Sequence, residues 1–86
     1  QFETMNLVIL TPDKELFQGK VTSVNVPAIG GRFEVLNGHA PIVAALGNGE
    51  VRYQLAKGEK RSIKIEQGFI EVLRNEVSLL VSGVEE

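Results

Sequence analysis

The chain has 86 residues, and its 9 basic and 11 acidic side chains leave a formal net charge of −2. One small domain fits this length, and a hydrophobic content of 43% is that of a folded chain rather than a disordered one. Because there is no cysteine, the composition excludes disulfides and thiolate metal sites. The basic residues are scattered along the chain and form no patch that would bind nucleic acid.

The N-terminal part predicts two strands separated by a turn. Residues 1–4 precede Met5 and are interpreted as an addition ahead of the natural start, so the domain is predicted over residues 5–84. Residues 7–10 are apolar on both faces of a strand, and Thr11-Pro12-Asp13 then predicts a turn. A short second strand is expected to end at Gly19.

The pair Gly30-Gly31 invites comparison with a phosphate-binding loop. Such a loop leads into a helix, and a phosphate-binding lysine or further glycines should follow at fixed spacing. Residues 32–36 alternate as a strand instead. We therefore predict that these glycines adopt positive φ in a turn.

His39 is the only histidine and lies in a turn sequence, Asn37-Gly38-His39-Ala40-Pro41. A general base needs an orienting carboxylate and a nucleophile or bound water, and neither Asp13 nor Glu34 stands at a helpful spacing. One histidine without cysteine does not make a typical zinc site. We predict no catalytic residue, no metal and no cofactor, and interpret His39 as a turn residue that caps the backbone or contacts a partner.

Asn48-Gly49 predicts a β-hairpin between residues 42–46 and 51–55, because both turn residues tolerate left-handed backbone angles. The later strands alternate cleanly and predict these inward-facing side chains: Val51, Tyr53, Leu55, Ile63, Ile65, Val77, Leu79 and Val81. Residues 69–73 depart from this pattern and are apolar on both faces. A strand of that kind lies between two layers or is covered by another protein.

Turn formers recur about every 8–12 residues along the chain, which is typical of an all-β sandwich or barrel. Several functions are compatible with such a domain. A lipoyl or biotinyl carrier is disfavoured because neither Lys14 nor Lys57 stands in the required hairpin pattern. A small enzyme should gather polar groups in a pocket, and a sugar-binding module should expose aromatic rings, whereas Tyr53 is predicted to face inward. A free-standing ligand-binding β-sandwich module is the alternative function.

Four segments, in order along the chain, resemble the epsilon subunit of F-type ATP synthases. The first, residues 7–21, is the opening strand with its Thr-Pro-acid turn and the short strand that runs to a glycine. The second, residues 27–41, is the glycine loop that leads through a strand to a Gly-His-Ala-Pro turn. The other two are Leu46-Gly47-Asn48-Gly49-Glu50-Val51 and Gln67-Gly68-Phe69-Ile70-Glu71-Val72. Arg32, Glu34 and Asn37 depart from the residues that many members carry.

The resemblance implies a flattened sandwich of about ten short, mostly antiparallel strands. It also implies a non-catalytic subunit of the central stalk that joins the gamma subunit to the c-subunit ring and couples proton translocation to ATP synthesis. The expected location is the cytoplasmic face of the bacterial inner membrane, reached only through the complex. Many members continue into a C-terminal pair of helices, which we do not expect here, so no inhibitory role is carried over.

The resemblance places partner-binding residues in two segments, with the c-ring edge at residues 29–34 and a neighbouring contact surface at residues 39–42. The predicted residues are Ile29, Gly30, Gly31, Arg32, Phe33, Glu34, His39, Ala40, Pro41 and Ile42. The strands that are apolar on both faces, at residues 7–10 and 69–73, are the candidates for an apolar face covered by another polypeptide.

Overall fold

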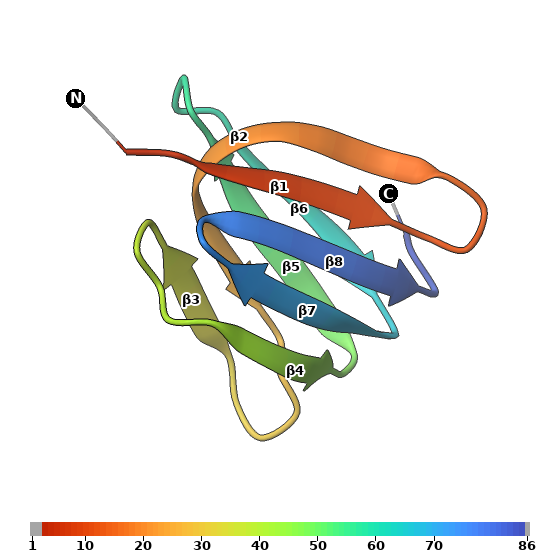
Figure 1. The fold of residues 1–86 in the computed structure, drawn as a ribbon. Helices are drawn as coiled ribbons and strands as arrows, with labels where there is room; N and C mark the ends of the chain where they lie inside the picture. The colour runs from red at the N-terminus through yellow and green to blue at the C-terminus, as the bar shows by residue number, and fades with distance from the viewer. Residues whose placement is uncertain (1–2, 86) are drawn as a thin grey trace.

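The computed structural model describes residues 3–85, which form eight β-strands (Figure 1). The strands are β1 Met5–Leu10, β2 Glu15–Val26, β3 Phe33–Leu36, β4 Ile42–Leu46, β5 Gly49–Leu55, β6 Lys60–Ile65, β7 Gln67–Leu73 and β8 Glu76–Ser82. Across these 83 residues no helix is long and apolar enough to cross a bilayer. The predicted all-β class is confirmed.

One mixed sheet curls into two layers. The strand order is β4-β7-β8-β1-β2-β5-β6, and β3 pairs with β2 off this path. Strand β2 belongs to both layers, because its first half pairs with β1 and its second half pairs with β3 and β5. Figure 1 shows β2 bending from the layer of β4, β7, β8 and β1 into the layer of β3, β5 and β6. Within the described residues, β1 and β8 form the one parallel pair of strands.

The core lies between the two layers and is built by alternation along each strand. The side chains predicted to face inward are buried, apart from Ile63, which is half-buried and packs against the others. No polar or charged side chain within residues 3–85 is buried. Burial of each fully enclosed Val, Leu or Ile contributes about 1.5–3 kcal/mol, so the hydrophobic pattern accounts for the layered arrangement.

The predicted hairpin at Asn48-Gly49 is wrong. Strand β4 pairs with β7, while β5 pairs with β2 and β6, so the chain crosses between layers at this point. Residues 27–29 occupy the edge of β4 instead: the Ile29 N–H donates to the Ala45 carbonyl at 3.0 Å, and the Gly47 N–H donates to the Pro27 carbonyl at 2.8 Å. A Cβ on Gly49 would lie 2.9 Å from Pro27 Cβ, so glycine permits this close crossing.

The prediction of about ten strands is also too high, since the described residues form eight. The chain does not break at Gly19, because β2 continues through it to Val26. The register of β2 against β5 shifts between Val21 and Ser23, which marks a β-bulge. A bulge bends a strand and increases its twist, so one long strand serves both layers where two short ones were expected.

Residues 1–4 were interpreted as an addition ahead of a natural start at Met5. Of these four, Gln1 and Phe2 lie outside the described part of the chain. The main-chain carbonyl of Thr4 accepts a hydrogen bond from Asn37 Nδ2 at 3.1 Å, so Thr4 contacts the folded domain. At the other end, Glu85 pairs with Lys64 and joins β8 to the edge of β6.

Candidate docking face

The outward side of β4, β7, β8 and β1 carries a contiguous set of hydrophobic side chains, which we call the apolar face. Its members are Val8, Leu10, Val43, Ala45, Phe69, Leu73 and Leu80. Four of them are strongly exposed for large hydrophobic residues: Val43 at 70%, Phe69 at 57%, Leu80 at 54% and Leu73 at 48%. A surface of this kind on a small domain marks a contact site for another molecule.

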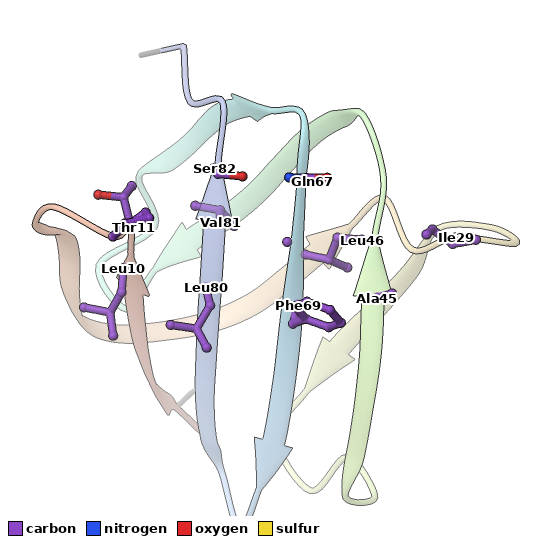
Figure 2. Close-up of a pocket in the computed structure, with 12 residues that line it drawn as sticks. Leu10, Thr11, Ile29, Ala45, Leu46, Gln67, Phe69, Leu80, Val81 and Ser82 are labelled. Carbon is purple, nitrogen blue, oxygen red and sulfur yellow. The ribbon is translucent and has the colours of Figure 1, made fainter.

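Strand register explains why these side chains are neighbours. Phe69 lies opposite Ala45 on one side and Leu80 on the other, and Leu80 lies opposite Leu10. The four residues form one row across four strands, as Figure 2 shows. Because adjacent strands are about 4.8 Å apart, the row extends roughly 14 Å, which suits the side of a helix or a packed loop.

A shallow groove runs along this row and ends at the loop after β2. Leu10, Phe69, Leu80 and Ala45 line it, and Ile29 closes the end beside Ala45 (Figure 2). Ile29 is 72% exposed although it is a large aliphatic residue. The groove is mostly apolar, so a partner that fills it would exclude water from it.

The outward side of the other layer has the opposite character. Glu34 and Asn25 lie there beside one carboxylate–guanidinium pair. In this pair Glu50 Oε1 and Arg52 Nε are 3.0 Å apart. The charged side chains here are exposed and compensate one another, and exposed pairs of this kind contribute little to binding or stability. The two outer faces therefore differ, and only the apolar face has the composition of a docking surface.

The structure divides the predicted segment 29–34 among three environments. Ile29 belongs to the end of the apolar groove, whereas Phe33 is half-buried against the core and Glu34 points outward from β3. Gly30 and Gly31 form the exposed loop tip with φ of 98° and 142°, so the predicted positive φ is confirmed. A Cβ at either glycine would meet nothing within 4 Å, which leaves this tip open to a partner.

Arg32 is held by the protein's own backbone and side chains. Its Nε donates to Asn25 Oδ1 at 2.8 Å, and its Nη2 donates to the Glu50 carbonyl. These bonds turn the guanidinium toward the polar layer and away from the apolar groove. Arg32 therefore stabilises the loop, and any contact it makes with a partner has to compete with these bonds.

The second predicted segment, residues 39–42, joins the first through a ring contact. The His39 ring stacks on Phe33 with centroids 6.1 Å apart and planes 29° apart. His39 Nδ1 lies 2.7 Å from the Ala40 carbonyl, so the interpretation of His39 as a residue that caps the backbone is confirmed. Ala40 and Pro41 are exposed, and Ile42 is half-buried against the core.

Val43 and Leu80 were not predicted to lie on a docking face, although each lies in a segment whose hydrophobic pattern could have indicated it. Leu80 interrupts the alternation of Ser78 and Ser82 on β8, and residues 42–46 are apolar at every position. The two strands that were singled out do contribute, through Leu10 on β1 and through Phe69 and Leu73 on β7. Within the described ranges, no group of three or more His, Cys, Asp or Glu could hold a metal ion.

A small two-layered β-sandwich with one apolar outer face defines a docking module of a larger assembly. The chain belongs to the family of the ATP synthase delta/epsilon chain β-sandwich domain, which matches residues 4–86. The resemblance drawn from the four sequence segments is thereby confirmed. The family match also favours an ATP synthase subunit over a free-standing ligand-binding module.

Several relatives are similar over most of the chain. The ATP synthase epsilon chain of Chlorobium limicola is 44% identical over 82 residues, which cover 95% of this chain and 93% of the relative. The epsilon chain of Chlorobaculum tepidum is 42% identical over 82 residues, with the same coverage of 95% and 93%. The epsilon chain of Solibacter usitatus is 42% identical over 83 residues, which cover 96% of this chain and 61% of the relative.

Two solved structures share the fold at low sequence identity. A chain of the Euglena gracilis mitochondrial ATP synthase, solved as OSCP, F1 and c-ring, superposes with a TM-score of 0.89 at 22% identity and covers 99% of this chain and 55% of that one. A chain of the Tetrahymena thermophila mitochondrial ATP synthase central stalk and c-ring gives 0.80 at 16% identity, with 100% and 69% covered. The β-sandwich prediction is confirmed by this likeness.

Proposed function

We propose that this chain is a non-catalytic rotor subunit of an F-type ATP synthase, which joins the gamma subunit to the c-subunit ring. Family membership supports the assignment to the ATP synthase, and two neighbours in fold are solved with a c-ring. In this proposal the domain transmits torque as a rigid adaptor. It reaches the membrane only through the complex, at the cytoplasmic face of a bacterial inner membrane.

The apolar face is the observation that carries the proposal. Phe69, Leu80 and Val43 remain more than half exposed in the isolated domain, although all three side chains are large and hydrophobic. Covering them by a partner removes apolar area from water at about 25 cal/mol per Å², and part of this gain is offset by the entropy of association. We assign this face to the gamma subunit.

The loop tip at Gly30 and Gly31 is assigned to the c-ring edge. It projects beyond the sandwich, and a Cβ added at either glycine would meet nothing within 4 Å, so a partner can approach closely. The adjoining contact surface is the exposed pair Ala40 and Pro41, held in place by the stack of His39 on Phe33.

The gamma assignment is tested by co-expression with the gamma subunit of the same organism and size-exclusion chromatography. The wild-type chain should co-elute with gamma, and the double variant Phe69→Ser/Leu80→Ser should elute separately. Leu36→Ser is the matched control, because Leu36 is 51% exposed but lies on β3, in the other layer. Co-elution of the double variant in the same proportion as wild type would contradict the assignment.

The c-ring assignment needs the assembled enzyme. Gly31→Trp should reduce proton-coupled ATP synthesis in membrane vesicles, because a bulky residue at φ of 142° distorts the tip and blocks close approach. His39→Glu should act in the same direction, by removing the stack on Phe33 and adding a charge. If both variants assemble and couple like wild type, these residues do not lie at the c-ring.

A further inference from the structure

Glu71 stands at the centre of the apolar face. It lies directly opposite Val43 on β4, and Phe69 and Leu73 flank it two residues away on the same side of β7. Ser78 lies opposite it on β8, so its two diagonal neighbours there are Leu80, opposite Phe69, and Glu76, opposite Leu73. Four of the six strongly exposed large hydrophobic side chains in residues 3–85 therefore surround one carboxylate.

Among residues 3–85 the Glu71 carboxylate has neither a counter-charge nor a hydrogen-bond donor, whereas several other carboxylates have one or the other. Glu76, the other carboxylate on β4, β7, β8 and β1, accepts a hydrogen bond from Asn6 Nδ2 at 2.7 Å. Glu50 and Glu59 pair with Arg52 and Arg61 on the other layer. The Glu71 side chain makes no hydrogen bond or ion pair with any of residues 3–85.

Exposure makes this arrangement acceptable in the isolated domain, because water solvates the carboxylate. A partner that covers Phe69, Leu80 and Val43 also takes Glu71 out of water. A carboxylate buried without a counter-charge is strongly unfavourable, and the neutral Ser78 hydroxyl on the strand opposite would compensate little of this cost. The docked state therefore requires a cationic side chain from the partner at this position.

We propose that Glu71 is the specificity-determining residue of the apolar face, and that it pairs with one arginine or lysine set among apolar side chains on the partner. The inference rests on the proposed function, since it describes the partner surface that the rotor assembly would supply. A guanidinium suits the position best, because it binds a carboxylate through two parallel hydrogen bonds and tolerates an apolar surround.

The test measures the affinity of the full chain for the gamma subunit of the same organism by calorimetry. Glu71→Gln keeps size and shape but removes the charge, and should weaken binding by roughly 30-fold or more. Glu50→Gln is the matched control, with the same change on the other layer. Because the Glu71 side chain has no partner among the residues that the structure describes, Glu71→Gln should unfold at the same temperature as wild type.

Charge reversal identifies the partner group. Glu71→Lys should abolish binding, and reversing the exposed arginines and lysines of gamma one at a time should restore it at a single position. Restoration by one reversal and by no other supports the pairing. Failure of all reversals to restore binding overturns it.

Failure of the inference is distinguishable from failure of the proposed function. If wild type itself does not bind gamma, the rotor assignment fails. If wild type binds and Glu71→Gln binds equally well, the rotor assignment stands and the role of Glu71 is overturned. A variant that binds gamma normally but self-associates, as seen by light scattering, also overturns it, since Glu71 would then serve to keep copies of the chain apart.

Discussion

Asn75 Oδ1 accepts a hydrogen bond from the main-chain N–H of Gly38 at 2.8 Å. Asn75 lies in the two-residue turn between β7 and β8, and Gly38 lies in the turn between β3 and β4. The bond therefore links the β7–β8 turn to the segment through which the chain passes from β3 in one layer to β4 in the other. Arg74 and Asn75 have φ of 52° and 62°, which fits the type I′ geometry that matches strand twist.

Two variants separate the two roles of Asn75. Asn75→Gly keeps the left-handed backbone but loses the bond, and should lower the free energy of unfolding by about 0.5–1.5 kcal/mol. Asn75→Ala loses the bond and also places a β-carbon in the left-handed region, which adds roughly 1–2 kcal/mol. Urea denaturation measures both values. Equal losses for the two variants would mean that the backbone angle imposes no strain.

Replacing Gly68 is predicted to lower the stability of the domain, because β7 approaches β8 closely at this position. A Cβ at Gly68 would meet the Leu80 carbonyl oxygen and would lie 2.9 Å from Val81 Cγ1. Since backbone on a paired strand cannot give way as a side chain can, Gly68→Ala should destabilise the domain by about 1–3 kcal/mol. Thermal unfolding followed by circular dichroism measures the effect.

Gly47 supplies the control for Gly68. A Cβ there would lie 3.7 Å from Ile29 Cγ1, an ordinary contact, and its φ lies outside the left-handed region. Gly47→Ala should therefore be neutral or stabilise by roughly 0.4–1 kcal/mol, because alanine restricts the unfolded chain. Only Gly68→Ala should lower the stability, and equal destabilisation by the two variants would contradict the steric account of Gly68.

Alternation along single strands was predictable from the sequence, and pairing between distant strands was not. Val51, Tyr53 and Leu55 are buried as predicted, because period-two patterning reports which side of a strand faces the core. The Asn48-Gly49 turn was assigned to a hairpin because a local signal says that the chain turns but not which strand it next meets. Pairing of residues 27–29 with the end of β4 decided that, and it depends on contacts distant in sequence.

The candidate site was predictable in the same uneven way. Runs that are apolar on both faces pointed to β1 and β7, but the row from Ala45 through Phe69 and Leu80 to Leu10 exists only because β4, β7, β8 and β1 are neighbours. The position of Glu71 amid exposed hydrophobic residues comes from the same register. In the sequence it was one of several single acids on alternating faces.

The Glu59–Arg61 pair gives a prediction on pH. A hydrogen bond from Arg61, at 3.0 Å from Nε, and its positive charge lower the pKa of Glu59 below its usual range. A carboxyl whose pKa is depressed on folding stabilises the folded state above its unfolded pKa, and this contribution is lost as pH falls through the folded pKa. Since both side chains are exposed to solvent, which screens their interaction, the effect on stability should be small.

An NMR titration of the glutamate side chains checks this assignment directly. Glu59 should titrate at a lower pH in wild type than in the Arg61→Ala variant, where the hydrogen bond and the charge are both absent. Arg61→Lys should leave an intermediate midpoint, because lysine keeps the charge but not the geometry of the guanidinium. An unchanged midpoint in Arg61→Ala would show that the pair does not persist in solution.

Ile70 and Phe69 are consecutive on β7 but face opposite sides, so they test the separation of core from docking face. Ile70 is fully buried, and Ile70→Ala should destabilise the isolated chain by about 2–5 kcal/mol through lost burial and a cavity. Phe69 is mostly exposed, so Phe69→Ala should change the free energy of unfolding by roughly 1 kcal/mol at most. In the presence of gamma the Phe69 variant should lose the stabilisation that binding gives wild type, because its effect lies in the complex. A large loss of stability for Phe69→Ala in the isolated chain would instead place that ring in the folded core and remove it from the docking face.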